Sequence, residues 1–372
     1  MSHERDHRYM ARAIQLATRG RYTSQPNPRV GCVLVRDEHV VGEGYHRRAG
    51  EPHAERNALA EAGERARGAT AYVTLEPCCH QGRTPPCTEG LIEAGVSRVV
   101  AAMRDPNPKV AGQGFERLRA AGIEVLEGVM GPQAEALNPG FIKRMSQGLP
   151  YIRCKLAMSL DGRTAMASGE SQWITSPEAR KDVQRLRALS GAILTGVGTL
   201  LSDDPSLTLR LDREALGIDT DLPLPRPVRV VLDPGLDTPL ESKMLSLPGL
   251  TLVICQDENP AHSAALEAAG AQVEMLPGDR GRLDLREVMH YLASQEINDL
   301  LVECGATLAG ALLEQGLIDE LVIYQAPHIM GDSARGLFHL PQIQRMDQRI
   351  PLRITDVRQI GPDIRLTAVP GA

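Results

Sequence analysis

The sequence is poor in the features that mark membrane-spanning and secreted proteins. It contains no run of about 18 consecutive apolar residues, so we expect no membrane-spanning helix. The first residues, MSHERD, are polar and contain no signal-peptide core. Aromatic residues make up only 3% of the chain, so its hydrophobic cores must consist mainly of aliphatic side chains and alanine.

An excess of positive charge and a disulfide framework are missing as well. The formal net charge is −6 and the isoelectric point is about 6.0, which argues against a dedicated nucleic-acid-binding protein. Seven cysteines, an odd number, are scattered over 372 residues and do not form the pattern of a disulfide framework. We therefore expect a cytoplasmic protein whose cysteines stay reduced.

The length suggests two domains, at about 150 residues for each domain. The boundary is expected in the stretch from residue 144 to 150, which divides the chain into residues 1–147 and residues 148–372. The first part has expected helices at 6–19, 54–62, 88–94 and 114–121, and strands at 30–35, 40–46, 71–75, 96–102 and 123–126. The second part has expected helices at 177–189, 261–269, 284–294 and 307–315, and strands at 151–157, 192–195, 228–232, 251–255, 299–302 and 320–325. This alternation predicts a layered α/β fold in each part, and the Pro-rich stretch 212–227 is expected to be a loop.

The most specific pattern combines a histidine, a glutamate and two cysteines. His53 and Glu55 open an expected helix, Cys78 follows a strand, and Cys87 opens another helix after two prolines. One histidine and two cysteines can hold Zn²⁺ with a water molecule in the fourth position, which is the ligand set of zinc deaminases. A helix N-terminus also favours the thiolate, the form of cysteine that binds metal. The pattern therefore predicts a zinc site.

The glutamate fits the chemistry of such a site. Zinc lowers the pKa of its bound water towards about 7, and the resulting hydroxide can attack an electron-poor ring carbon that carries an amine. The departing amine needs a proton, so a carboxyl group must lie beside both the water and the ring. Glu55 is the expected proton shuttle and is not a zinc ligand.

The residues alone leave alternatives open. Deaminases usually carry Cys-x-x-Cys, whereas eight residues separate Cys78 from Cys87, so Cys79 is a rival ligand and His80 a weaker one. A structural zinc module is a second alternative, although it would normally close the coordination with a fourth Cys or His. A deaminase acting on a base in tRNA or DNA is a third, although the acidic balance counts against it.

Two polar residues near the zinc pattern have less specific signals. Asn27 lies between two prolines just before a buried strand, so it either shapes a turn or reaches a substrate. His46 lies at the end of the next strand, and we interpret it as a packing residue or a support for a ligand.

The second part has two glycine turns but no Gly-x-Gly-x-x-Gly. Residues 196–199 follow the strand at 192–195, and residues 305–307 lie between the strand at 299–302 and a helix. Backbone N–H groups at such turns can bind phosphate. Two such turns in one α/β domain favour a dinucleotide site.

Motifs from both parts together resemble a known family. They are the zinc pattern, KLAMSLDG at 155–162, GESQWIT at 169–175, TLLSDDP at 199–205 and the segment from Glu303 to Gly310. In this order, and over nearly the whole chain, they resemble the bifunctional deaminase–reductases of bacterial riboflavin biosynthesis. In that family the long spacing between the cysteines is normal, which favours Cys78 over Cys79.

The resemblance implies two successive reactions on small phosphorylated molecules. A cytidine-deaminase-like α/β/α domain would remove the 2-amino group of 2,5-diamino-6-(5-phosphoribosylamino)pyrimidin-4(3H)-one as ammonia. A dihydrofolate-reductase-like domain would then use NADPH to reduce the ribosyl group of the product to ribityl. It further implies a homo-oligomer, dimer or tetramer, with no nucleic-acid or membrane partner.

The resemblance also implies site residues. The zinc ligands would be His53, Cys78 and Cys87, with Glu55 as the catalytic residue. Substrate positions would be Asn27, Lys155, Ser171, Arg187, Asp203, Leu207, Arg210 and Glu303, and the two arginines could donate to the substrate phosphate. NADPH positions would be Ala157, Trp173, Thr199, Asp203, Gly305, Ala306, Thr307, Leu308, Ala309, Gly310 and Ala311. Without the resemblance, an ion-paired arginine and a packed tryptophan would be the simpler interpretations of Arg187 and Trp173.

Overall fold

The computed structural model describes residues 2–81, 84–108, 110–219, 221–257 and 259–371. The chain forms two compact units. The first consists of Met1–Gly148 and Arg213–Leu224, and the second of Leu149–Asp212 and Pro225–Ala372. Part of the Pro-rich stretch 212–227 therefore belongs to the first unit, although it follows the start of the second in the sequence. No helix in the described ranges is both long and apolar enough to cross a membrane.

The first unit is built on one five-stranded sheet with the order β2-β1-β3-β4-β5. Its strands are β1 (Gly31–Arg36), β2 (His39–Tyr45), β3 (Thr70–Val73), β4 (Arg98–Ala101) and β5 (Glu124–Glu127). Its helices are α1 (Ser2–Ala17), α2 (Ala54–Ala62), α3 (Cys87–Glu93), α4 (Gln113–Ala120), α5 (Gly131–Glu135), α6 (Pro139–Gln147) and α9 (Arg213–Leu216), with 3-10 turns η1 (Thr18–Gly20) and η2 (Gly63–Ala66). Strand β1 pairs antiparallel with β2 and β3, whereas β3, β4 and β5 run parallel.

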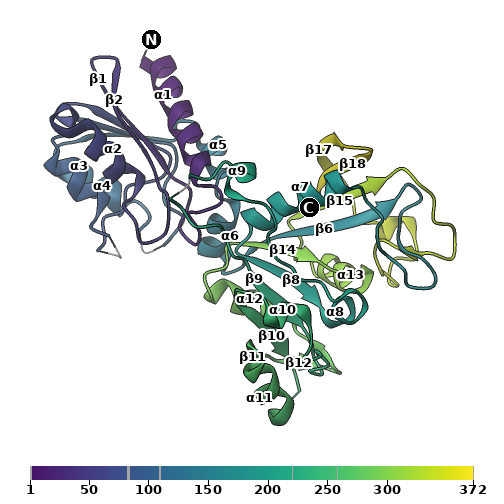
Figure 1. The fold of residues 1–372 in the computed structure, drawn as a ribbon. Helices are drawn as coiled ribbons and strands as arrows, with labels where there is room; N and C mark the ends of the chain where they lie inside the picture. Colours follow the sequence, from purple (N-terminus) through teal and green to yellow (C-terminus); the bar gives the residue numbers. More distant parts are fainter. Residues whose placement is uncertain (1, 82–83, 109, 220, 258, 372) are drawn as a thin grey trace. The chain divides into compact units, whose positions relative to one another are not determined.

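The sheet has a hydrophobic core on each face because β1 is buried on both sides. Cys32 and Leu34 point into the core shared with α2, α3 and α4. Val33 and Val35 point into the core that α1 covers, together with Tyr72. Figure 1 shows α1 on one face of this sheet and α2, α3 and α4 on the other. The expected α/β layers are thus confirmed for the first unit, and α2 and α3 lie side by side on one face.

The segment from residue 213 to 224 contacts the end of β2 through two carboxylates. Asp219 accepts a hydrogen bond from the Tyr45 hydroxyl at 2.7 Å. Asp221 accepts from Arg47 at 2.6 and 2.7 Å. These contacts explain why the segment groups with the first unit.

A partly buried ion pair between Asp6 of α1 and Arg98 of β4 joins the helix to the sheet. Asp6 is almost fully buried and accepts from Arg98 at 2.9 and 3.0 Å and from the Tyr72 hydroxyl at 2.8 Å. Burial acts to raise the pKa of Asp6, but the hydrogen bonds from Arg98 and Tyr72 leave it below its usual value. A carboxyl whose pKa is lowered by folding stabilises the fold above its unfolded pKa, and this contribution is lost as the pH falls through the folded pKa.

We expect Asp6→Ala to lower the free energy of unfolding of the first unit by about 1–3 kcal/mol, because the Tyr72 hydroxyl and two Arg98 N–H groups lose their acceptor while Arg98 keeps its bond to Glu124 at 2.9 Å. Urea unfolding followed by deaminase activity measures this loss. Arg5→Ala is the matched control on the same helix, since its exposed pair with Glu38 contributes about 1 kcal/mol or less. Equal losses in the two variants would contradict the role given to Asp6.

The second unit is built on a nine-stranded sheet with the order β11-β10-β9-β8-β14-β6-β15-β18-β17. The strands of this sheet are β6 (Tyr151–Ser159), β8 (Ala192–Gly196), β9 (Val228–Leu232), β10 (Thr251–Cys255), β11 (Ala271–Met275), β14 (Asp299–Glu303), β15 (Glu320–Ala326), β17 (Leu352–Ile360) and β18 (Asp363–Pro370). Two separate two-stranded sheets consist of β7 (Arg163–Ala165) with β16 (Arg335–Gly336), and of β12 (Gly278–Asp279) with β13 (Arg282–Leu283). The helices of the second unit are α7 (Pro177–Leu189), α8 (Val197–Asp203), α10 (Lys243–Ser246), α11 (Pro260–Ala268), α12 (Leu285–Ser294) and α13 (Ala306–Glu314), with the 3-10 turn η3 (Met346–Gln348).

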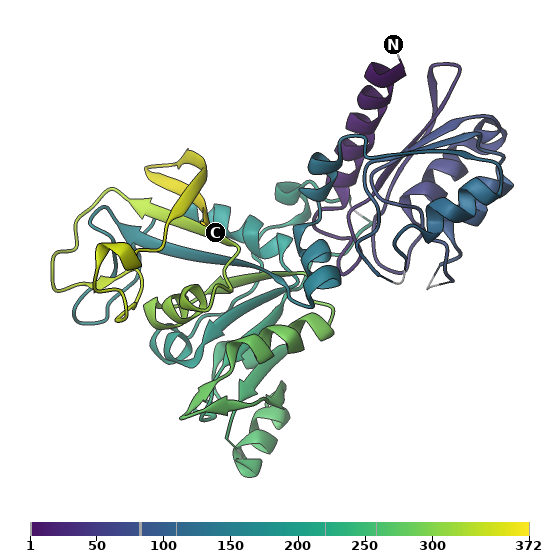
Figure 2. The same ribbon diagram turned by 180° about the vertical axis from the view of Figure 1, so that it is seen from behind.

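This second sheet is also covered on both faces. Helices α12 and α13 pack on one face, and α7, α10 and α11 on the other. From β11 to β15 the neighbouring strands are parallel, and the antiparallel hairpin of β17 and β18 extends the sheet at one edge, as Figure 2 shows. Because these strands are parallel, their carboxyl ends all lie at the same end of the strands, and α/β proteins bind ligands in the crevice outside those carboxyl ends.

Candidate active sites

The structure brings His53, Cys78 and Cys87 together in the first unit. One ligand atom from each lies within 4.8 Å of the others. The His53 Nδ1 atom is 3.6 Å from the Cys78 sulfur and 3.4 Å from the Cys87 sulfur. Two sulfurs and one imidazole are a donor set that suits zinc. In the described part of the chain, neither Cys79 nor His80 belongs to this cluster.

Two helix ends create the cluster. His53 is the N-cap of α2, and Cys87 is the first residue of α3, directly after the N-cap Pro86. Cys78 lies in the loop between β3 and α3, where its sulfur accepts from the Cys87 backbone N–H at 3.4 Å. Donation from a helix N-terminus stabilises a thiolate, so the local backbone supports metal binding.

Glu55 lies beside this cluster in the first turn of α2. Its side chain is nearly inaccessible to solvent, with 3% of the residue exposed. Burial raises the pKa of Glu55 to about 7, and the neighbouring Cys78 acts in the same direction. Glu55 is not part of the group of three ligand atoms.

Two polar residues, His46 and Thr84, lie against the His53 ring, and a third, Asn27, contacts His46; Asn27 and His46 were named from the sequence. Asn27 contacts the His46 Nε2 atom at 3.0 Å, and the His46 ring meets the His53 ring edge-on with centroids 5.2 Å apart. The His46 Nδ1 atom is 3.3 Å from the Pro52 carbonyl oxygen, so Nδ1 carries the hydrogen and Nε2 accepts from Asn27. Burial lowers the pKa of His46 to about 4, with the charge of His53 as a further cause.

Thr84, the other residue against the His53 ring, was missed by the sequence analysis. Its hydroxyl lies 3.2 Å from the His53 Nε2 atom. A hydrogen bond to the second ring nitrogen fixes the orientation of a metal-binding histidine. Thr84 precedes the Pro-Pro-Cys segment that was singled out, but only the fold shows that it faces His53.

The second unit contains a cleft of about 1790 Å³ at the carboxyl ends of its parallel strands. Most of the residues named for this half line it: Lys155, Ala157, Ser171, Trp173, Arg187, Thr199, Asp203, Leu207, Arg210, Glu303, Gly305, Ala306, Thr307, Leu308 and Ala311. Ala309 and Gly310 do not line it. Gly310 serves packing instead, since a Cβ atom there would lie 2.2 Å from the His339 carbonyl oxygen.

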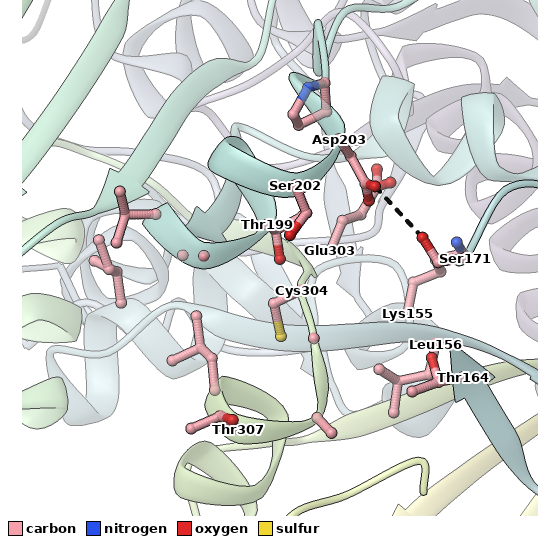
Figure 3. A pocket seen from close by; sticks show the side chains of 18 of the residues that line it. Lys155, Leu156, Thr164, Ser171, Thr199, Ser202, Asp203, Glu303, Cys304 and Thr307 are labelled. Atoms are coloured by element: carbon pink, nitrogen blue, oxygen red, sulfur yellow. Dashed lines mark hydrogen bonds between the residues drawn. The ribbon is translucent and has the colours of Figure 1, made fainter. Parts of the chain in front are cut away.

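A group of charged side chains lies at one end of this cleft. Arg187 donates to Glu303 at 2.6 and 2.9 Å, and to the Thr208 carbonyl oxygen at 2.8 Å. Lys155 is paired with Glu303 in the register of β6 and β14. Figure 3 shows Lys155 and Glu303 near Asp203, which accepts from the Ser171 hydroxyl at 3.4 Å. The interpretation of Arg187 as an ion-paired arginine is thus confirmed. Its Nε, Nη1 and Nη2 atoms already donate hydrogen bonds to Glu303 and to the Thr208 carbonyl oxygen.

The electrostatics of this group keep opposite charges close together. Burial raises the pKa of Glu303, but Arg187 outweighs it and leaves the net pKa below the usual value. Burial also lowers the pKa of Lys155, and Glu303 partly opposes this shift. Glu303 therefore stays a carboxylate and holds the Arg187 guanidinium in place, with Lys155 on the neighbouring strand.

Arg210 and Trp173 are more accessible than Arg187. The Arg210 side chain is exposed in the cleft, and its backbone N–H donates to Gln184 at 2.8 Å. Trp173 is 66% exposed, with the guanidinium of Arg180 stacked 4.6 Å from a ring centroid. The packed interpretation of Trp173 is wrong, and its ring can receive a flat ligand group.

The glycine turns of the second unit also lie at the cleft. Gly305 is the N-cap of α13, as expected for the turn at 305–307. The segment 196–199 is not a loop between a strand and a helix, because Gly196 is the N-cap of α8 and the helix begins at Val197. Both segments place backbone at the cleft, which is about 1790 Å³ in volume and has room for a dinucleotide.

Comparison with known proteins identifies both units. Residues 3–103 match the family described as the cytidine and deoxycytidylate deaminase zinc-binding region, and residues 150–366 match the RibD C-terminal domain. Riboflavin biosynthesis protein RibD of Escherichia coli (strain K12) is 52% identical over 367 residues, which cover 98% of this chain and 99% of that protein. The RibD protein of Haemophilus influenzae is 50% identical and covers 97% of this chain and 96% of its own.

Solved structures agree with these relatives. Acinetobacter baumannii RibD, form 2, matches with a TM-score of 0.91 and 45% identity, covering 100% of both chains. A Thermotoga maritima protein described as a diaminohydroxyphosphoribosylaminopyrimidine deaminase/5-amino-6-(5-phosphoribosylamino)uracil reductase matches with a TM-score of 0.84 and 32% identity, again over 100% of both chains.

These matches confirm a cytidine-deaminase-like first unit and a dihydrofolate-reductase-like second unit. A tRNA or DNA deaminase with an unrelated tail is excluded, because the second half matches the RibD C-terminal domain. The cofactors are zinc for the deaminase, which the three clustered ligand atoms can hold, and NADPH for the reductase. The chain belongs to the RibD family of bifunctional deaminase–reductases of riboflavin biosynthesis.

Proposed function

We propose that the first unit removes the 2-amino group of 2,5-diamino-6-(5-phosphoribosylamino)pyrimidin-4(3H)-one as ammonia, and that the second reduces the ribosyl group of the product to ribityl. The observation that carries the first step is the cluster of His53, Cys78 and Cys87 beside the buried Glu55. The names of the full-length relatives support both steps. In this proposal the deaminase domain is residues 1–147 and the reductase domain residues 148–372, except that the segment 213–224 belongs to the first compact unit.

In the deaminase, the chain's own residues hold the metal and move protons. His53, Cys78 and Cys87 would hold zinc, which would supply a water molecule made acidic enough to attack the ring near neutral pH. Glu55, buried beside these ligands, would carry a proton from the attacking water to the departing amine. Thr84 orients the His53 ring, and Asn27 is placed by His46 to meet the pyrimidine.

In the reductase, the cleft orients the ribose and the cofactor. NADPH supplies the hydride, and residues of α8, Trp173 and the N-terminal end of α13 bind it. Glu303 fixes Lys155 and Arg187 beside the ribose, while Asp203 and Ser171 hold its hydroxyl groups. The exposed Arg210 donates to the substrate phosphate, and Leu207, whose side chain is buried in the core, lines the cleft beside it.

Product analysis tests this function directly. The full chain is incubated with the diaminopyrimidine, with and without NADPH, and the products are identified by mass. We expect ammonia and the ribosylaminouracil without NADPH, and the ribityl compound with it. Ammonia released from a tRNA or cytidine control but not from the diaminopyrimidine would overturn the proposal.

The proposed contact between Arg210 and the substrate phosphate can be tested by kinetics. We expect Arg210→Ala to raise the KM for the phosphorylated substrate by about one to two decades, because a charge-assisted phosphate contact contributes about 1.5–3 kcal/mol. The KM for NADPH should stay near its original value, and Asp203→Asn should lower kcat instead. Steady-state kinetics with each ligand varied in turn separates these effects.

A neighbouring arginine provides the control for Arg210. Arg185 lies on α7 with an exposed side chain and is not part of the cleft. Arg185→Ala should therefore leave both KM values unchanged. Equal weakening of substrate and NADPH in Arg210→Ala would mean that this arginine supports the fold and not the phosphate.

We also propose that the protein is a cytoplasmic homo-oligomer, a dimer or tetramer. A reducing compartment suits thiolate ligands such as Cys78 and Cys87. The exposed side chains of Leu352, Ile354 and Val357 on the edge strand β17 suit pairing with a second copy. The mass in solution, measured by light scattering, tests the assembly.

A further inference from the structure

Arg56 and Gly90 lie one helical turn behind the metal cluster. Arg56 is three residues after His53 on α2, and Gly90 is three residues after Cys87 on α3. Residues three apart share a helix face, so each of these two residues lies behind a ligand on the same face of its helix. The guanidinium of Arg56 occupies the space beside Gly90 that a Cβ atom would fill. A Cβ atom at position 90 would lie 2.6 Å from the Arg56 Cζ and Nη1 atoms and 2.8 Å from Nε.

The guanidinium is held in this position. Its Nη2 atom donates to the Pro86 carbonyl oxygen at 2.8 Å, directly before Cys87 in the chain. Its Nε atom is buried and has no hydrogen-bond partner among the residues that the structure describes. A buried donor without a partner is costly, so the packing must favour this position strongly enough to offset that cost. The guanidinium is therefore restrained by one hydrogen bond at Nη2 and by its close packing against Gly90.

We propose that Arg56 and Gly90 form a spacer that sets how closely the Cys87 helix approaches the His53 helix, and thereby the geometry of the zinc site. This inference rests on the proposed zinc ligands. Arg56 is a positioning residue: it acts on the metal through the Pro86–Cys87 peptide and through the backbone of α3. The spacer needs glycine at position 90, since any other side chain would push the guanidinium off the helix.

Zinc release from the full chain tests the spacer. The wild type, Gly90→Ala, Arg56→Ala and the double variant are loaded with zinc and mixed with a chromogenic chelator, and the release rate is measured. We expect each single variant to release zinc about tenfold faster, the size of effect that supporting residues have on metal sites. In the double variant the alanine methyl enters the space left by the guanidinium, so its release should be slower than that of Gly90→Ala.

The higher helix propensity of alanine in Gly90→Ala should stabilise α3, so it opposes the faster zinc release that we expect from this variant. Replacing a mid-helix glycine by alanine favours the helix by itself. Faster zinc release from Gly90→Ala therefore cannot come from a weaker α3. The reductase activity of the same chain reports whether the remainder of the protein is intact, and the KM and kcat of deamination separate substrate binding from metal geometry.

Arg65→Ala is the matched control. Arg65 also donates to backbone carbonyls, those of Ala62 and Glu61, but it lies in η2, beyond the end of α2 that is far from His53. Its zinc release should equal that of the wild type. Wild-type release from Gly90→Ala, or strictly additive effects in the double variant, would overturn the spacer. A wild-type chain that holds no zinc would instead overturn the proposed ligand set.

Discussion

Glu55→Gln is expected to abolish deamination while the protein keeps its zinc. The amide has nearly the same size as the carboxyl group but cannot accept and return a proton, and general acid–base catalysis of this kind contributes about 10²–10⁴-fold to rate. The metal stays because Glu55 is not among the three clustered ligand atoms. Ammonia release and zinc content, measured on the same sample, check both parts.

Two internal controls belong to this experiment. The reductase in the second unit should turn over at its normal rate, which shows that the chain is folded. Glu64→Gln, an exposed carboxylate beyond the end of the same helix, should deaminate normally. Loss of zinc from folded Glu55→Gln would make Glu55 a ligand, and near-normal ammonia release would remove it from the mechanism.

Cys87→Ser is expected to lose zinc on dialysis, whereas Cys79→Ser keeps it. A thiolate is a soft ligand that binds zinc far better than a serine hydroxyl. The Cys87 and Cys78 sulfurs lie close to the His53 Nδ1 atom, whereas Cys79, next in the chain, lies outside the cluster. Zinc content by atomic absorption, with circular dichroism as the check on folding, gives the comparison.

Comparing Cys87→Ser with Cys79→Ser tests the ligand assignment, because Cys79 is adjacent to Cys78 in the chain and is the alternative ligand. Equal zinc loss in folded Cys87→Ser and Cys79→Ser would mean that Cys79 takes part in binding. Retention of zinc in both would leave Cys78 and His53 as the main ligands. Either result would replace the ligand set proposed above.

Regular elements with a strong local pattern could be predicted from the sequence. Helix α7 and strand β10 have the expected bounds because Ser176 caps the helix before Pro177, and because TLVIC is a continuous apolar run. The hairpin of β17 and β18 was missed. Its apolar residues Leu352, Ile354 and Val357 are exposed, and their alternation breaks where the register shifts between Ile354 and Asp356, so no regular strand pattern marks it. It is held by pairing with β15, which is distant in the sequence.

The residue types of the sites could be predicted, but their partners could not. The order of His53, Cys78 and Cys87 in the sequence was informative because zinc restricts the ligand types. The pairing of Arg187 with Glu303 joins residues 116 positions apart, and no local pattern indicates it. The same holds for Thr84 beside His53, which depends on how one loop folds back on a helix end.

The connection between the units has a consequence for the evolution and engineering of shorter enzymes. Because the chain leaves the second unit after Asp212 and re-enters it at Pro225, the first unit is discontinuous in the gene. A truncated gene that ends at codon 148 would encode a deaminase without Asp219 and Asp221, leaving Tyr45 and Arg47 without these acceptors. A single-function deaminase derived from this chain would need surface substitutions beside β2 to replace the lost segment.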